Sequence, residues 1–212
     1  MERFTTTPRT RLRRIPDRGS YDRAAIAAIL DEALFCHVGF AAEDGQPYVI
    51  PTIHARLGDE LVFHGARASR LLASMAGPVC VTVTLIDGLV LARSVFHHSM
   101  NYRSVVVLGT AVEITDPDRK RRALDAIVEH VAPGRSAVAR PPSPKELAAT
   151  RVMALPLDEV SAKVRTGPPI DDPEDLERPC WAGVVPLTLG AGEPIAAPDL
   201  AAGLAPPGPP RL

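Results

Sequence analysis

The feature that most constrains the fold is a series of β-prone runs joined by very short connections. The first three runs are residues 34–41, 48–57 and 60–66. Asp44 and Gly45 form a strong hairpin-turn signal in the first connection, and Gly58 and Asp59 provide a turn in the second. Parallel strands need crossovers of a dozen or more residues, so these connections predict an antiparallel meander.

Three longer β-prone runs follow, and helical patterns are fewer. The later runs are residues 79–92, 103–114 and 152–164. Asp87 and Gly88 interrupt the first of them, and we expect the strand to break there. Helices are predicted from about Tyr21 to residue 34, over residues 68–75 and over residues 118–131. Six or seven antiparallel strands with two or three helices predict a mainly β protein, and closure into a barrel would remove exposed strand edges.

Composition changes at the two ends of the chain. The basic N-terminal stretch has no apolar core of the length that a secretory signal requires. The last stretch is rich in Ala, Gly and Pro, which is typical of a loose tail. We therefore expect an N-terminal arm over residues 1–19, one folded domain over residues 20–189 and a tail over residues 190–212.

The charge balance excludes several function classes. Lys and Arg total 24 and Asp and Glu total 25, which gives a net charge of −1. This near-balance predicts no general attraction to nucleic acid or to an anionic membrane. No stretch of 18 apolar residues is present, so no transmembrane helix is expected. Three scattered cysteines, Cys36, Cys80 and Cys180, are too few for a disulfide framework, and a reduced cytoplasmic protein is expected.

Residues 65–72 combine features that suit a phosphate group. Small residues allow close approach of the backbone, Ser69 supplies a hydroxyl and Arg70 supplies several donors at the start of the predicted helix. The same residues can also form an ordinary helix cap followed by a solvated arginine. Both interpretations stay open.

The densest polar group lies in residues 94–109. Its members are His97, His98, Ser99, Asn101, Tyr102, Arg103 and Ser104. They precede a strongly apolar run, so they are expected at the mouth of a barrel or in a solvated loop. Adjacent residues on a strand point to opposite sides, so the two histidines do not suggest a metal site, and none is predicted.

Other candidates are isolated residues. His54 and His64 lie on consecutive predicted strands and can be cross-strand neighbours, or they can be core or rim histidines without a function. Trp181, the only tryptophan, suits either the core or stacking on a planar ligand. No nucleophile paired with a base can be identified, so the catalytic residues stay unassigned.

The motifs together, in this order and spacing, resemble the pyridoxamine 5′-phosphate oxidase-related proteins and in particular their flavin-nucleotide-binding branch. The motifs are HVGF, DGQPYVIPT, VFHG, SRLL, DGLVLARS, HHSMNYRSVVVLG, PGR, SAKVRTGPP and WAGVVP. The resemblance runs from about Arg18 to Pro186. It implies a six-stranded antiparallel split β-barrel with flanking helices, and a homodimer that binds FMN at the subunit interface.

The resemblance also implies the residues of the cofactor site. They are Val49, Ile50, Pro51, Thr52, His54, His64, Gly65, Ser69, Arg70, Tyr102, Arg103, Ser104 and Trp181. The strand from Val49 to His54 would run along the flavin ring, and Ser69 and Arg70 would hold the phosphate. The family has a second basic residue where Leu71 stands here. The Trp-x-Arg ending of the vitamin-converting oxidase is missing, so pyridoxine-phosphate oxidation is not expected.

The resemblance implies an FMN-dependent oxidoreductase that moves hydride or electrons between a nicotinamide or another small-molecule substrate and an acceptor. Two alternatives stay open. One is a non-catalytic flavin-binding protein that acts as a store or a sensor. The other is a split-barrel protein that uses haem or a deazaflavin.

Overall fold

The structure is a computed structural model that describes residues 2–206 and 208, and within them eleven strands form two antiparallel sheets. The strands are β1 (Gly19–Ser20), β2 (Phe35–Ala41), β3 (Pro47–Ile53), β4 (Ala55–Arg56), β5 (Glu60–Ala66), β6 (Pro78–Leu91), β7 (Ser99–Thr110), β8 (Val112–Glu113), β9 (Thr150–Pro156), β10 (Glu159–Arg165) and β11 (Gly183–Pro186). The α-helices are α1 (Arg23–Glu32), α2 (Arg70–Ser74), α3 (Pro117–Val131), α4 (Arg135–Val138) and α5 (Pro144–Ala149). The prediction of a mainly β, antiparallel protein with flanking helices is confirmed.

The chain passes between the two sheets several times. The main sheet has the order β1-β10-β7-β6-β2-β3, with β11 added to β6, and the second sheet has the order β4-β5-β9-β8. Only His54 separates β3 from β4, so the chain passes from one sheet to the other there. The prediction of one strand over residues 48–57 is therefore wrong, because the run divides at this crossing.

The larger core lies between the sheets and under α1. Ile26, Phe63, Val81 and Leu155 are fully buried there, and they come from α1, β5, β6 and β9. A smaller core beneath α3 is formed by residues such as Val62, Ala123, Ile127 and Val152. Asp116 caps α3 by accepting a hydrogen bond from the backbone N–H of Arg119 at 2.7 Å, which agrees with the helix predicted over residues 118–131.

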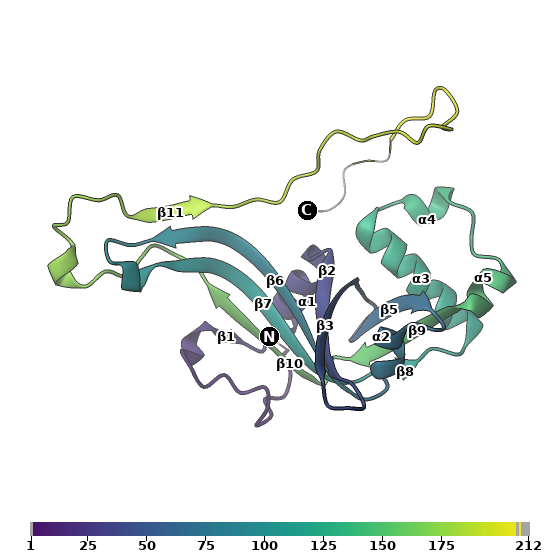
Figure 1. Cartoon of the computed structure of the whole chain (residues 1–212), viewed down its shortest axis with the longest axis horizontal. Helices are drawn as coiled ribbons and strands as arrows, with labels where there is room; N and C mark the ends of the chain where they lie inside the picture. The colour runs from purple at the N-terminus through teal and green to yellow at the C-terminus, as the bar shows by residue number, and fades with distance from the viewer. Residues whose placement is uncertain (1, 207, 209–212) are drawn as a thin grey trace.

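Strands β6 and β7 are long and continue beyond the two-sheet body. Figure 1 shows them as a curved ribbon that leaves the body, with β11 alongside β6 at its outer part. The predicted break at Asp87-Gly88 is wrong: β6 stays one strand, and its register with β7 shifts between Ile86 and Gly88. Such an irregularity is a β-bulge, which bends a strand without ending it. We call residues 86–102 together with β11 the hairpin extension.

The two ends of the chain differ in their contacts. The N-terminal segment packs on the body, because Phe4 is 8% exposed and Thr7 Oγ1 donates to Glu159 Oε1 at 2.7 Å. After β11 the chain crosses above the body in an extended conformation (Figure 1). The division into an arm, a domain and a tail at residues 19 and 189 stays a prediction. Among helices of the described residues, none has both the length and the apolar character to cross a membrane.

Candidate functional site

One face of β3 carries part of the predicted site and has no covering layer. Val49 is 67% exposed and Ile53 is 41% exposed on this face. The register with β2 places Pro51 beside His37 and Ile53 beside Phe35, whose side chain is 51% exposed. We call the outward face of β2 and β3 the open sheet face. Its exposed apolar side chains can contact a planar ligand.

Not every predicted residue of β3 lies on this face. Side chains alternate along a strand, so Ile50 and Thr52 point to the other side, and both are half-buried. Ile50 packs against the larger core. Of the four residues predicted along the flavin ring before His54, Val49 and Pro51 are the exposed pair.

The start of α2 accommodates both interpretations of residues 65–72. The Ser69 hydroxyl accepts a hydrogen bond from the backbone N–H of Leu72 at 3.4 Å, so Ser69 is the helix cap. Arg70 is exposed, and its guanidinium carbon lies 4.4 Å from the centre of the Tyr48 ring. Within the described residues Arg70 has no carboxylate partner. Its donors are therefore available to an anionic ligand.

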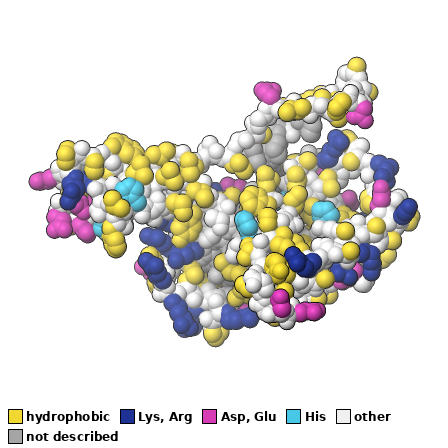
Figure 2. All heavy atoms as spheres, viewed as in Figure 1, with side chains coloured by type: hydrophobic (Ala, Val, Ile, Leu, Met, Phe, Trp, Pro, Cys, Tyr) yellow, Lys and Arg dark blue, Asp and Glu magenta, His cyan; other side chains and the backbone are white. Residues whose placement is uncertain are grey.

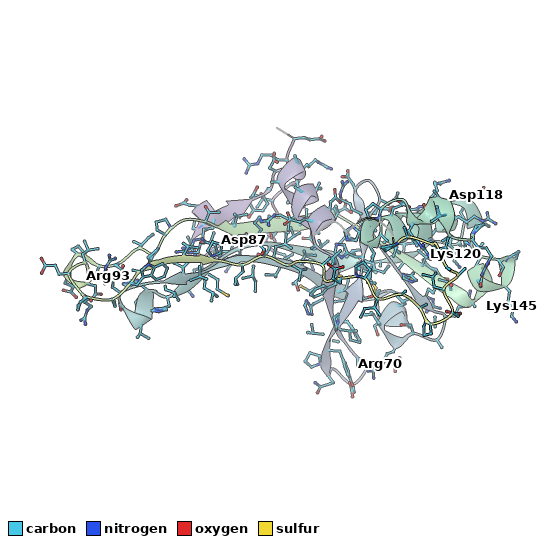
Figure 3. All side chains as sticks on the ribbon, turned by 90° about the horizontal axis from the view of Figure 1, so that it is seen from above. Arg70, Asp87, Arg93, Asp118, Lys120 and Lys145 are labelled. Atoms are coloured by element: carbon cyan, nitrogen blue, oxygen red, sulfur yellow. The ribbon has the colours of Figure 1, made fainter. Side chains whose placement is uncertain are left out.

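The surroundings of Arg70 are hollowed. Tyr48, Arg70 and Gly77 are among the residues that line a depression of about 660 Å³ beneath the turn between β2 and β3. Gly65, next to the last residue of β5, faces α2, and a Cβ atom there would lie 3.0 Å from the Leu72 side chain. The absence of a side chain at Gly65 lets β5 and the start of α2 approach each other closely. In Figure 3, Arg70 lies on a part of the molecule well separated from the hairpin extension.

His54 lies in the interior, which argues against its predicted cofactor contact. Its side chain is 0% exposed, and its Nε2 atom lies 3.0 Å from the carbonyl oxygen of Leu30. The His130 ring lies 5.2 Å away, and His130 Nε2 is 2.8 Å from the carbonyl oxygen of Ala33. The two imidazoles thus satisfy carbonyls at the end of α1. Burial lowers the pKa of His54 to about 4.

His54 and His64 are not neighbours. The β4–β5 register pairs Ala55 with Val62 and Arg56 with Leu61, and His64 pairs with Val152 on the opposite side of β5. His64 is exposed, whereas His54 is buried, so the interpretation of a cross-strand histidine pair is wrong.

Two exposed histidines have free ring nitrogens. Within the described residues neither His37 nor His64 has a hydrogen-bond partner for its imidazole, whereas His97 is 3.0 Å from Asp172 and His98 is 2.9 Å from the carbonyl oxygen of Ser94. Partial burial lowers the pKa of His64 and so favours the neutral imidazole, which is the form that binds metals. Sequence reasoning missed His37. The alternation of the run 34–41 was the available signal, since it places His37 on the face opposite Val38.

Arg103 is held by carboxylates of its own chain. Its guanidinium forms ion pairs with Glu32 at the end of α1 and with Asp87 in the β-bulge, and these partners raise the pKa of Arg103. The three charges line a hollow of about 580 Å³ that Leu187 and Leu189 help to enclose. Because two carboxylates already occupy its donors, Arg103 is poorly suited to hold a flavin phosphate.

The remaining predicted residues lie far from β3. Strands β2 and β6 separate β3 from β7, so Tyr102 and Ser104 do not join Val49 in one cluster within the chain. Ser104 Oγ donates to the carbonyl oxygen of Lys163 at 3.2 Å. Trp181 is 64% exposed beside β11, and its ring covers Gly183, where a Cβ atom would approach to 2.8 Å. Trp181 therefore lies neither in the core nor beside β3.

No group of three or more His, Cys, Asp or Glu residues within residues 2–206 and 208 is arranged to hold a metal ion. A single imidazole can still act as an axial ligand of haem iron, because the porphyrin supplies the other four nitrogens.

Comparison with known proteins identifies the family. The family model described as pyridoxamine 5′-phosphate oxidase matches residues 22–164, more than half of the chain. The chain belongs to the pyridoxamine 5′-phosphate oxidase-like family. The resemblance inferred from the motifs and the split-barrel fold are thereby confirmed. No protein with a curated description matches this family member.

Two solved structures are similar over nearly the whole chain. The flavocytochrome Anf3 from Azotobacter vinelandii is 39% identical, with a TM-score of 0.89 over 95% of this chain and 94% of the other. An FAD and haem binding protein from Mycobacterium smegmatis is 42% identical, with a TM-score of 0.85 over 90% and 94% of the two chains. A putative 5-nitroimidazole antibiotic resistance protein from Bacteroides thetaiotaomicron is 27% identical, with a TM-score of 0.58 over 69% and 86%.

Proposed function

We propose that this protein binds a flavin nucleotide and a haem and transfers electrons between them. The observation that carries the proposal is the open sheet face, which presents apolar side chains and the free imidazole of His37, with Arg70 near its β3 edge. Two similar structures support it, since one is named a flavocytochrome and the other an FAD and haem binding protein.

Residues of β3 and α2 suit a flavin. Val49 and Ile53 offer apolar contact to an aromatic ring system. The Ser69 hydroxyl and the Arg70 guanidinium offer hydrogen bonds to a phosphate. A phosphate monoester carries a charge of about −1.5 to −2 at neutral pH, and Leu71 supplies no second cation. The pyrophosphate of FAD carries about two charges in total, so the charge of Arg70 alone does not favour one nucleotide over the other. We propose FAD because one similar structure is named an FAD and haem binding protein, with the FMN implied by the sequence motifs as the alternative.

His37 and His64 are the residues suited to haem iron. Both are exposed, and neither imidazole is committed to a hydrogen bond within the described residues. Bound flavin would accept a hydride or two electrons from a nicotinamide or another small-molecule donor, and haem would take electrons singly. The chain's contribution is to position the two groups and to exclude solvent between them. No ionisable side chain is assigned a proton-transfer role.

The proposal includes a homodimer. Tyr102 and Ser104 lie two strands away from β3, so they reach a ligand on β3 only from a second copy of the chain. Symmetric dimers are the commonest oligomers, and a twofold axis would complete two equivalent sites at once.

The first test is the visible spectrum of the purified protein and the mass of the cofactors released by acid. We expect a flavin band, a Soret band and the mass of FAD. A protein that takes up neither flavin nor haem on reconstitution would overturn the proposal. Release of FMN alone would favour the cofactor that the sequence motifs imply.

Matched variants test the assigned residues. Arg70→Ala removes a charge-assisted hydrogen bond, so we expect FAD affinity to fall roughly 10- to 100-fold while riboflavin affinity is retained. Arg67→Ala is the control, because Arg67 is exposed three residues away. Equal weakening of both ligands would contradict a phosphate contact.

The haem ligands are tested by a second set of variants. His37→Gln and His64→Gln should each be compared with His98→Gln for loss of the Soret band with flavin retained. Full haem binding in both variants would refute the ligand assignment.

A further inference from the structure

Positive charge is concentrated in the N-terminal segment. Residues 2–18 contain six arginines and only two acidic residues, Glu2 and Asp17, although the whole chain has a net charge of −1. Figure 2 shows dark blue side chains gathered where Figure 1 shows the N-terminal segment below the main sheet. The rest of the molecule therefore carries a net negative charge.

Most of these cations have no counter-charge. Arg9 pairs with Glu159, but within the described residues Arg11, Arg13, Arg14 and Arg18 form no ion pair. The first three of these four are exposed. Two cations of β10 adjoin them, and Lys163 Nζ donates to the carbonyl oxygen of Arg14 at 3.2 Å. We call Arg11, Arg13, Arg14, Arg18 and Lys163 the basic patch.

Arg165 lies beneath the basic patch and has no carboxylate partner within the described residues. Its side chain is 6% exposed, and its guanidinium donates to Asn101 Oδ1 and to the carbonyl oxygens of Gly167 and Pro168 rather than to a carboxylate. Burial and the nearby charge of Arg18 lower its pKa. A cluster of uncompensated cations of this kind attracts an anionic partner and accelerates encounter with it.

The basic patch adjoins the sheet that carries the proposed redox site. Gly19 of β1 pairs with Lys163, and Lys163 pairs with Ser104 of β7. Arg165 pairs with Tyr102 in the same ladder. The cations therefore lie beside the two β7 residues that the homodimer would bring to the flavin.

The character of the patch favours a protein partner over other polyanions. Proteins that bind single-stranded nucleic acid use exposed aromatic rings as stacking platforms. The aromatic side chain at Tyr21 is instead fixed, since its hydroxyl donates to the carbonyl oxygen of Thr10 and accepts from the N–H of Leu12. Membrane-surface binding commonly uses an amphipathic helix, and the only helical turn here is the three-residue segment Pro16–Arg18.

We propose that the basic patch is the docking surface for a small acidic electron-carrier protein that reduces the bound flavin. The inference rests on the proposed function, because it supplies the electron donor for the same site. Each docking oxidises one carrier by one electron, and two dockings with two protons from solvent complete the two-electron reduction of the flavin.

The test compares two triple charge reversals in the cofactor-loaded protein. R11E/R13E/R14E changes the patch. R122E/R135E/K145E changes the same number of exposed cations on α3, α4 and α5, which form no ion pair with any residue that the structure describes. Lys145 lies at the end of the molecule opposite the hairpin extension (Figure 3). The probes are an oxidised flavodoxin and an oxidised [2Fe–2S] ferredoxin, and calorimetry measures their affinity at low and high salt.

We expect the patch reversal to weaken binding of at least one probe by about tenfold or more at low salt, and the control reversal to change it by less than about twofold. Reduction of the flavin by the reduced probe should slow in parallel, whereas reduction by dithionite should not. Similar affinities for the two triple variants, or no binding of either probe, would overturn the inference. Tighter, patch-dependent binding of a duplex oligonucleotide or a phosphatidylserine vesicle would also overturn it.

Binding of the oxidised probes does not require electron transfer, so the two proposals fail separately. A chain that takes up neither flavin nor haem on reconstitution, but still binds flavodoxin through the patch, would refute the proposed function alone. A flavin-loaded chain with equal affinities in both triple variants would refute the docking surface alone.

Discussion

The same two strands, β6 and β7, behave differently inside the body and in the hairpin extension. In the body Val79, Val81 and Val83 of β6 are 5%, 0% and 1% exposed, because α1 and the second sheet cover them. Beyond the β-bulge, Ile86 is 48% exposed and Leu89 is 39% exposed. On the opposite face Val90 is 0% exposed and Ala92 is 5% exposed, so the hairpin extension is covered on one face and open on the other.

The uncovered part is apolar rather than polar. Val95 and Phe96 at its tip are 90% and 89% exposed, and Met100 on β7 is 45% exposed. The tip is nevertheless fixed, since the Asp171 carboxylate accepts from the Arg93 backbone N–H at 2.8 Å and from its guanidinium at 2.9 Å. Contiguous exposed apolar surface marks an interaction site in a soluble protein. An apolar strand pair with one uncovered face fits the homodimer included in the proposed function.

The largest expected difference between the two regions is in stability. Phe63→Ala removes a fully buried ring from the body, and we expect the free energy of unfolding to fall by about 3–5 kcal/mol. Phe96→Ala removes an exposed ring of the same type from the hairpin extension, and we expect a change within about 0.5 kcal/mol at concentrations where the chain is monomeric. Urea titration of both variants measures the two values.

Comparable losses of stability in the two phenylalanine variants would contradict this difference, because they would mean that the Phe96 ring is covered in the isolated chain. A loss of stability for Phe96→Ala that grows with protein concentration would show that the ring is buried only in an assembly.

The next effect is a pH dependence that belongs to the body. Burial lowers the pKa of His54 from 6.5 to about 4, so the unfolded chain binds the proton more tightly than the folded one between these values. Stability from the neutral, buried imidazole is present above about pH 6.5 and falls as the pH drops toward 4. The loss from this group between pH 7 and pH 4 is about 3 kcal/mol.

His54→Gln should flatten the stability profile over this range, even though it lowers stability at pH 7. His98→Gln in the hairpin extension is the matched control, because its imidazole is exposed and contacts the carbonyl oxygen of Ser94. Chemical denaturation at several pH values compares the two slopes. A His54→Gln protein with the parental slope would show that another group causes the acid sensitivity.

Local patterns predicted the body better than the hairpin extension. The Asp44-Gly45 turn and the Asp116 cap depend on neighbouring residues, so the strands around the first and the helix after the second were predictable. The Asp87-Gly88 pair carries the same local signal as a turn, but pairing with β7 and β11 on both sides keeps the chain extended there. The two regions differ in which of their faces are covered, and the covering residues lie far away in the sequence.

The candidate site shows the same limit. Ser69 and Arg70 were recognisable because a cap and a flanking cation are local features. The partners of Arg103 were not, because Glu32 lies 71 positions away in the sequence. His54 and His37 occupy similar apolar runs, and only the crossing between the sheets makes the first buried and the second exposed.

The smallest change in stability is expected for the ion pairs that link the body to the hairpin extension. Arg103 links Glu32 of the body to Asp87 at the base of the hairpin extension, whereas Arg56 binds Asp31 at 2.9 and 2.5 Å entirely within the body. All of these side chains are partly exposed to solvent, so Arg103→Met and Arg56→Met should each cost only about 1 kcal/mol of stability.

Hydrogen exchange distinguishes the two methionine variants. Arg103→Met should speed exchange of the β6 and β7 amides beyond the β-bulge, because the side-chain link between the hairpin extension and α1 is then lost, and Arg56→Met should not. Arg103→Lys should give an intermediate rate, since an ammonium cannot bind both carboxylates with the geometry of a guanidinium. Equal exchange in the two methionine variants would show that the hairpin extension is held independently of this ion-pair cluster.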